Sequence, residues 1–365
     1  MASGGDGMSR YCRSLLLSIV LIAFVGVGCN KEKQGARILV ITAVDNEYDA
    51  VKTLVPNGRE RILEGRETTV GEVNGSRVAV MRGGWGKAQS AAATAIGIRE
   101  FSPAIVLFAG VGAGVDPTRA ASGDVVIVES SFQYDLGEKG STGFQLWAPE
   151  TPTEKAYPSA NFESSRLTDT ALAAAKKVPL RAWELRTQCV CSNEGVPAGG
   201  CAAPVVQVGR SVPRVCKGIA ATADMFLADP VVAEMLAKTK NVSVVDMETA
   251  AVAEETINSG LQFLAVRVVA DMPNGSNENL YYCLKPPSGE RLHEVIGSIL
   301  RELSTSLANS PAASEPTSVA NSSALANSFT LANSQEAGQA DECAIPEAAD
   351  ADAGSSGSSV STPPK

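Results

Sequence analysis

One strand–helix–strand segment constrains the fold more than any other part of the chain. Val242–Met247 has the length and composition of a buried strand, a helix is predicted over Thr249–Ser259, and Phe263–Ala270 forms a second apolar strand. This order is typical of sheets with parallel strands, whose carboxyl ends line the ligand crevice. Glu248 and Asp271 follow the two strands directly. We therefore expect both carboxylates to face one bound molecule, and cleavage of a glycosidic bond is a reaction that uses such a pair.

The rest of the chain continues the alternation of strands and helices. With 365 residues and 44% hydrophobic content, it is long enough to bury one large core. We expect a single three-layer α/β/α domain over residues 35–307, with a central mixed, largely parallel sheet and a Cys-rich insertion near 133–217. Further strands are predicted at Ala36–Val44, Arg77–Arg82, Pro103–Val111 and Asp124–Ser130, and further helices at Glu47–Leu54, Lys87–Phe101, Thr168–Lys177, Pro230–Lys238 and Arg291–Leu307.

Charge and local context argue against two classes of function. The net charge is −9 and no cluster of Lys and Arg is present, so nucleic-acid binding is not expected. The glycine-rich segment Gly110–Gly114 lacks the context of a dinucleotide-binding loop, because Val115–Thr118 forms a turn that leads into another strand instead of a helix. Glycines such as Gly112 instead allow the backbone to approach a ligand closely.

The N-terminus has the features of a bacterial lipoprotein signal. Arg10 and Arg13 precede an apolar run over Leu15–Val27, and Gly28 precedes Cys29. Residues 1–29 are predicted to be a signal peptide that ends at the lipidation site Cys29, with an uncleaved membrane anchor as the alternative. We therefore expect an exported protein, anchored by lipid on the periplasmic or cell-surface side of a membrane.

The remaining cysteines and the C-terminus fit an exported protein. Four cysteines lie in a loop-rich stretch, and in an oxidising compartment they are predicted to form two disulfides that pin the insertion. A zinc site is the alternative, and the sequence does not fix the connectivity. Residues 308–365 are rich in Ser, Ala and Asn and are predicted to be a disordered tail. The clustered cysteines are Cys189, Cys191, Cys201 and Cys216, and Cys283 and Cys343 lie beyond them.

Five blocks of sequence, in order along the chain, carry a family resemblance. They are ILVITAVDNE (38–47), GGWGKAQSAAA (83–93), VLFAGVGAGVDPTRAASGDVVIVES (106–130), VVDMETAA (244–251) and AVRVVADM (265–272). Together they resemble the nucleoside phosphorylase and nucleosidase superfamily, and within it most closely the 5′-methylthioadenosine/S-adenosylhomocysteine nucleosidases. The resemblance covers most of residues 37–307 and weakens over 131–217.

This resemblance implies a role for individual residues. Glu47 matches the carboxylate that activates the attacking water, and Asp271 matches the acid that protonates purine N7. Glu248 matches the carboxylate that binds the ribose hydroxyls, beside Met247 on the sugar face. The remaining implied substrate contacts are Phe226, which stacks on the base, Leu227, whose backbone contacts the base edge, and Arg267, which matches a family arginine. Family members are commonly homodimers.

The expected reaction is hydrolysis of 5′-methylthioadenosine and S-adenosylhomocysteine to adenine and the 5-substituted ribose. Negative charge near the ribose and protonation of the leaving base both favour an oxocarbenium-like transition state. Two alternatives stay open: phosphorolysis, with Arg82 as a candidate phosphate ligand, and an exported nucleoside-binding lipoprotein without turnover. Leu107–Gly110, where phosphorolytic relatives typically hold an arginine, contains none. The resemblance implies no metal and no organic cofactor.

Overall fold

The structure is a computed structural model, which describes residues 37–141, 143–146, 166–186, 205–273, 278–308 and 343. These ranges contain most of the predicted α/β domain. The predicted signal peptide with Cys29, and the cysteines Cys189, Cys191 and Cys201, lie outside the described residues.

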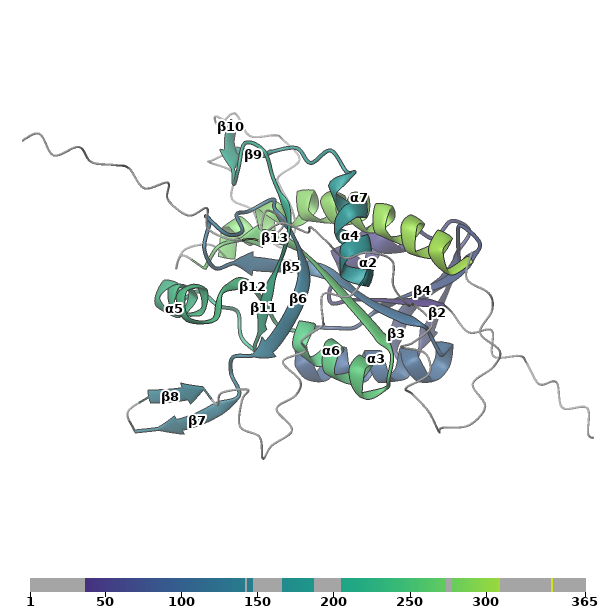
Figure 1. The fold of residues 1–365 in the computed structure, drawn as a ribbon, viewed down its shortest axis with the longest axis horizontal. Coiled ribbons are helices and arrows are strands. Elements are labelled where there is room, and N and C mark those ends of the chain that lie inside the picture. Colours follow the sequence, from purple (N-terminus) through teal and green to yellow (C-terminus); the bar gives the residue numbers. More distant parts are fainter. Residues whose placement is uncertain are drawn as a thin grey trace, which may run out of the picture.

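A nine-stranded mixed sheet forms the centre of the fold (Figure 1). β12 pairs with β11 in parallel and with β5 in antiparallel orientation. The five strands β12, β11, β6, β13 and β5 therefore close into a ring, and the sheet continues from β5 through the other four strands. The order across the sheet is β12 (Val242–Asp246), β11 (Val215–Thr222), β6 (Val125–Gln133), β13 (Gln262–Asp271), β5 (Ile105–Gly114), β1 (Ile38–Thr42), β4 (Ser76–Arg82), β3 (Arg66–Val73) and β2 (Arg59–Leu63).

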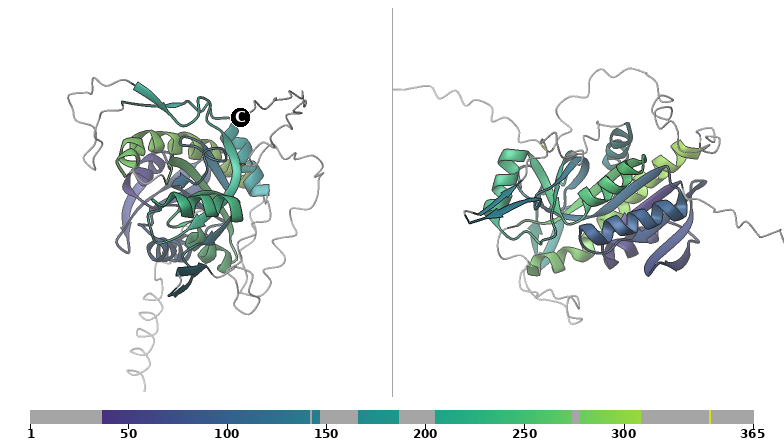
Figure 2. Two further views of the ribbon diagram at one scale, coloured as in Figure 1. Left: turned by 90° about the vertical axis from the view of Figure 1, so that its left-hand side faces the viewer. Right: turned by 90° about the horizontal axis from the view of Figure 1, so that it is seen from below.

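Helices cover both faces of this sheet, which confirms the predicted α/β/α layers. One face packs against α2 (Asp45–Lys52), α4 (Arg166–Lys176) and α7 (Glu278–Ala308). The other face packs against α3 (Lys87–Phe101) and α6 (Thr249–Asn258), seen in front of the sheet in the right-hand view of Figure 2. α5 (Pro230–Lys240) packs beside β12. Within the described residues, no helix has both the length and the apolar character needed to cross a bilayer.

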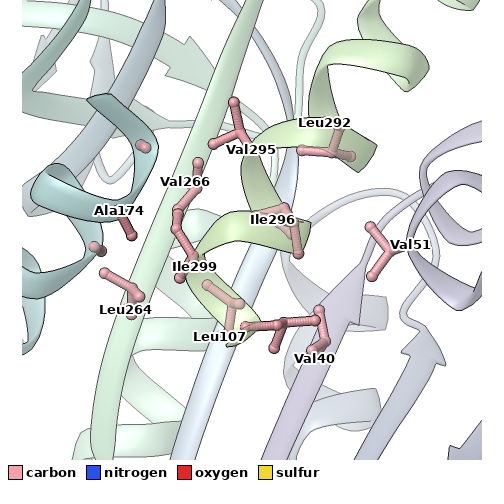
Figure 3. Close-up of a cluster of buried hydrophobic side chains, with 14 of the residues drawn as sticks. Val40, Val51, Leu107, Ala174, Leu264, Val266, Leu292, Val295, Ile296 and Ile299 are labelled. Atoms are coloured by element: carbon pink, nitrogen blue, oxygen red, sulfur yellow. The ribbon is translucent and has the colours of Figure 1, made fainter. Parts of the chain in front are cut away.

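Continuous apolar strands explain why the sheet is covered on both faces. Successive side chains of a strand point to opposite faces, so Ile38 and Val40 of β1 contact one helical layer while Leu39 and Ile41 contact the other. All four side chains are fully buried. Figure 3 shows the first layer, where Val295, Ile296 and Ile299 of α7 pack against the sheet, together with Val40, Leu107, Leu264 and Val266.

Several elements depart from the sequence-based expectation. The hairpin of β2 and β3 was not predicted, because its charged residues hide the strand pattern, and α7 begins before Pro286 and Pro287, which the pattern treats as helix breakers. Within the predicted insertion, α4 packs into the core and β11 is an inner strand of the sheet. Two small hairpins leave the sheet, β7 (Gly137–Gly140) with β8 (Gly143–Leu146), and β9 (Trp183–Arg186) with β10 (Val205–Val208).

A disulfide joins β11 to the C-terminal segment. Cys216 is bonded to Cys343, 127 positions away, and both residues are buried in the hydrophobic cluster beneath α3 and α6. The N–H of Cys343 donates to the carbonyl oxygen of Lys217 at 2.8 Å, beside the part of β11 that β12 does not pair. The prediction that Cys216 pairs within the clustered cysteines is therefore wrong, and one point of the predicted disordered tail belongs to the core. Cys283 is also disulfide-bonded.

This bond generates a prediction about stability. Cys216→Ser, Cys343→Ser and the double variant should each lower the free energy of unfolding by about 2–5 kcal/mol, because each removes the same constraint on the unfolded chain. Chemical denaturation under non-reducing conditions measures this loss. Losses that add in the double variant, or no loss at all, would show that the two cysteines do not act through one bond.

Candidate active site

A pocket opens where strands from across the sheet end. The space between its walls is about 630 Å³, including the part open to solvent. Each lining residue lies at or just beyond the carboxyl end of a strand or at the start of the helix that follows, as the crevice rule for α/β sheets predicts. The lining is Ala43, Val44, Glu47, Trp85, Val111, Gly112, Ala113, Tyr134, Met225, Phe226, Leu227, Val245, Asp246, Met247, Glu248 and Asp271.

The predicted site residues come together in this pocket, with one exception. Residues as far apart in the chain as Glu47 and Asp271 line the same cavity. Arg267 does not line it: the guanidinium is fully buried beneath the pocket wall, so its predicted contact with substrate is replaced by contacts with the pocket's carboxylates. The residues that the structure does place in the lining are Glu47, Gly112, Phe226, Leu227, Met247, Glu248 and Asp271.

Glu47 is held by backbone donors at the start of α2. One carboxylate oxygen accepts from the N–H groups of Ala43 at 2.8 Å and Val44 at 3.1 Å, and the other accepts from Val111 at 2.8 Å. Burial raises the pKa of Glu47, while Arg267 and the three N–H groups act in the opposite direction. The side chain thus both caps the helix and presents a fixed hydrogen-bond acceptor to the pocket.

Glycine at position 110 leaves room for this carboxylate. A Cβ there would lie 2.8 Å from Oε1 of Glu47 and 2.5 Å from Nη1 of Arg267, closer than real Cβ contacts allow. A Cβ at Gly112 would meet the backbone oxygen of Val245 at 2.8 Å, where β5 and β12 pair closely. The glycine-rich end of β5 therefore allows close packing around the acids. This packing accounts for the glycines of Gly110–Gly114.

Arg267 forms the buried electrostatic centre of the site. One guanidinium nitrogen lies 2.6 Å from Asp246 and 3.6 Å from Glu248, and Nε donates to the hydroxyl of Thr249 at 2.9 Å. The guanidinium also lies 4.1 Å from the centre of the Phe108 ring. A buried arginine needs such partners, since leaving its charge unpaired carries a large desolvation penalty.

Asp246 fixes the turn that carries Glu248. Its carboxylate accepts from the backbone N–H of Glu248 at 3.2 Å and of Thr249 at 3.1 Å, and from the hydroxyl of Thr222 at 2.6 Å. Glu248 in turn accepts from the N–H of Gly86 at 2.9 Å. Burial raises the pKa of Glu248 to about 7, with Arg267 acting against it and Asp246 acting with it. Asp246 is not among the residues predicted from the sequence, although an Asp three residues before a helical Thr is a capping signal.

Asp271 lies at the end of β13, opposite Ala113 of β5. Only 3% of the residue is exposed, and burial raises the pKa of its carboxyl to about 7, with its own backbone N–H as the only opposing influence. Glu47 and Glu248 each feel the positive charge of Arg267, whereas Asp271 does not. Asp271 is therefore a carboxyl that can keep its proton near neutral pH and donate it, without a nearby cation to stabilise its ionised form.

Apolar side chains form the rest of the pocket wall and its mouth. Leu227 is buried, whereas Phe226 is half exposed and Trp85 and Met225 are also exposed. Lys87 links the loops at this mouth. Its side-chain ammonium nitrogen lies 2.6 Å from Asp135, and its backbone N–H donates to Asp224 at 2.7 Å. Three lining residues of these loops were not predicted from the sequence: Trp85, Tyr134 and Met225. Isolated apolar residues in loops carry no periodic signal.

The pocket lining contains no Lys, Arg or His, within the part of the chain that the structure describes. Arg82, the candidate phosphate ligand, instead forms ion pairs with Asp45 and Glu67. Across the described ranges, no group of three or more His, Cys, Asp or Glu side chains is arranged to hold a metal ion. Cys216 is not available as a zinc ligand because it is disulfide-bonded.

Comparison with known proteins agrees with this fold. The sequence profile of the phosphorylase superfamily matches residues 37–282. A curated relative from Marinomonas sp. (strain MWYL1), named 5′-methylthioadenosine/S-adenosylhomocysteine nucleosidase, is 28% identical over 234 residues, which cover 64% of this chain and 84% of the relative.

Solved structures share the fold at lower sequence identity. The 5′-methylthioadenosine/S-adenosylhomocysteine nucleosidase of Neisseria meningitidis, in complex with methylthio-immucillin-A, is 20% identical with a TM-score of 0.53, covering 72% of this chain and 98% of that one. The futalosine hydrolase of Helicobacter pylori is 18% identical with a TM-score of 0.54, covering 73% of this chain and 97% of that one. At these identities the likeness extends to the fold alone.

The buried arginine generates a prediction about stability. Arg267→Met should lower the free energy of unfolding by about 3–5 kcal/mol, because it leaves Asp246 and Glu248 buried without their cation. The loss should grow as the pH rises through about 7, because Glu248, whose pKa burial raises to about that value, then ionises without the cation. Arg82→Met is the matched control, since its partially exposed ion pairs contribute about 1 kcal/mol or less. Equal losses in the two variants would contradict the central role of Arg267.

Proposed function

This chain belongs to the phosphorylase superfamily, and from that premise we propose that it hydrolyses the N-glycosidic bond of purine nucleosides. The observation that carries the proposal is the convergence of Glu47, Glu248 and Asp271 on one pocket whose lining has no cationic side chain. The proposed substrates are 5′-methylthioadenosine and S-adenosylhomocysteine, from which the enzyme releases adenine. The names of the curated relatives support this substrate class.

Asp271 is the proposed general acid. Protonation of purine N7 lets the base leave as a neutral molecule, and this requires a carboxyl that is still protonated near neutral pH. The buried position of Asp271 and its pKa of about 7 support this role. General acid catalysis of this kind contributes roughly 10²–10⁴-fold to the rate.

Glu47 is the proposed base for the attacking water. Burial raises the pKa of Glu47, whereas Arg267 and three backbone N–H groups act against that rise and support the ionised form, which accepts a proton from water. The same negative charge disfavours a phosphate ion at this end of the pocket. The pairing of Arg82 with Asp45 and Glu67 also leaves phosphorolysis without a cationic ligand in the described lining. These observations favour water over phosphate as the nucleophile.

The remaining lining residues bind and orient the nucleoside in this proposal. Glu248 accepts hydrogen bonds from the ribose hydroxyls, and Met247 packs beside it against the sugar. Phe226 stacks on the base, and the backbone of Leu227 contacts the base edge. Negative charge from Glu248 also stabilises the positive charge that develops on the ribose in the transition state.

We further propose that the protein is an exported, lipid-anchored homodimer. The buried Cys216–Cys343 disulfide supports an oxidising compartment. Exposed apolar side chains at the pocket mouth, Trp85, Met225 and Phe226, support a second subunit that covers them. Detergent-phase partitioning of the full chain and of Cys29→Ala tests the anchor, and light scattering tests the dimer.

An exported binding lipoprotein without turnover is the competing function, which does not require a protonated Asp271.

The decisive experiment is to incubate the protein with 5′-methylthioadenosine, S-adenosylhomocysteine, adenosine and inosine, with and without phosphate. We expect free adenine to appear at the same rate in both conditions, and free base is measured by chromatography. Release that requires phosphate would replace hydrolysis by phosphorolysis. Tight binding without release in either condition would favour the binding lipoprotein.

Asp271→Asn should lower kcat/KM by at least about 10²-fold with little change in nucleoside affinity, because Asn cannot supply the proton. In the wild type, the protonated fraction of Asp271 falls as the pH rises through its pKa of about 7, so kcat/KM should decline on the alkaline side. Ionisation of Glu47 should set the acidic limb. The exposed Asp49→Asn is the matched control and should keep the wild-type profile. Wild-type activity in Asp271→Asn would remove this residue from the mechanism.

A further inference from the structure

Tyr134 combines a place in the pocket lining with a buried hydroxyl group. The residue follows β6, its ring is buried in the apolar cluster below α5, and only 6% of it is exposed. The phenolic oxygen is buried and has no hydrogen-bond partner among the described residues. Within the described ranges, several buried side-chain oxygen and nitrogen atoms have no hydrogen-bond partner. Among them, the Tyr134 oxygen is the one that belongs to a pocket-lining residue.

A buried polar group without a partner is rare, because its desolvation is not compensated. Replacing this hydroxyl by hydrogen would remove the penalty, so core packing alone does not account for it. Burial, together with the nearby Asp246 and Asp135, raises the pKa of Tyr134 above its ordinary value. The phenol therefore keeps its proton at any working pH and can both donate and accept a hydrogen bond.

The wall around Tyr134 contains Leu227, the proposed contact to the edge of the base. Leu227, Val245 and Ala113 pack in the same cluster as Tyr134 and also line the pocket. Ala113 is the cross-strand partner of Asp271, whose proposed role is to protonate the base. Glu47 and the ribose-binding Glu248 lie among other elements, at the start of α2 and the start of α6.

We propose that Tyr134 is a further substrate-binding residue, whose hydroxyl hydrogen-bonds a polar edge atom of the purine base. The bound base supplies the partner that the free protein lacks. This inference rests on the proposed function and refines it, because it adds a side-chain contact that selects bases with a polar atom at this position.

The test compares Tyr134→Phe with Tyr48→Phe. The first variant keeps the ring and loses only the unpaired hydroxyl. The second loses a hydroxyl that is bonded to Thr69 at 2.8 Å, is equally buried, and lies outside the pocket lining. Three quantities are measured for each protein: the melting temperature, the affinity for free adenine by calorimetry, and kcat/KM for 5′-methylthioadenosine.

Tyr134→Phe should keep or raise the melting temperature while adenine affinity and kcat/KM each fall about 3- to 10-fold, as expected for one lost hydrogen bond. Tyr48→Phe should show the opposite pattern, with a lower melting temperature and unchanged adenine affinity. Unchanged adenine affinity in Tyr134→Phe would overturn the inference. The proposed function would still stand in that case if the wild-type protein releases adenine. A wild type that neither binds adenine nor releases base would overturn both.

Discussion

The candidate site depends on one fully buried cation. Arg267 lies beneath the pocket, where its guanidinium pairs with Asp246 and Glu248 and its charge also acts on Glu47. These three carboxylates can therefore be held close together in a small apolar space. The surrounding sequence is arranged to accommodate this charge. Gly110 leaves the room in which Glu47 and Arg267 meet, and Phe108 offers its ring face to the guanidinium. Loss of the cation would leave the acids without compensation for their burial.

The position of each acid relative to this cation separates their chemistry. Burial raises the pKa of Glu47, but Arg267 and three backbone donors act against this rise and support the ionised form that a base requires. Asp271 has neither the cation nor several donors, and its burial favours the protonated form that an acid requires. The two carboxyl groups are both buried but differ in their neighbouring cation and hydrogen-bond donors, and such a difference is a general way for one site to supply both an acid and a base near neutral pH.

Sequence reasoning recovered the elements whose signal is local. The apolar strands β1, β5 and β13 and the amphipathic helices were predicted, as was the convergence of Glu47, Glu248 and Asp271, because strand ends meet at one edge of such a sheet. It missed features that depend on distant partners. β11 contains Lys217 and Gly218 and is recognised as a strand only beside β6 and β12, while the Cys216–Cys343 bond joins segments that no local pattern connects. Likewise, Arg267 was predicted as a substrate-binding residue, whereas its position beneath the pocket wall depends on packing that no local pattern reveals.

The central claim is that the three acids surround a single nucleoside, with water as the nucleophile. A crystal structure with a non-hydrolysable purine nucleoside analogue tests this most directly. The account predicts N7 of the base within hydrogen-bond distance of Asp271, the ribose hydroxyls on Glu248, and an ordered water between Glu47 and the anomeric carbon. An analogue bound with its base away from Asp271, or with Glu47 and Glu248 on separate ligands, would contradict it.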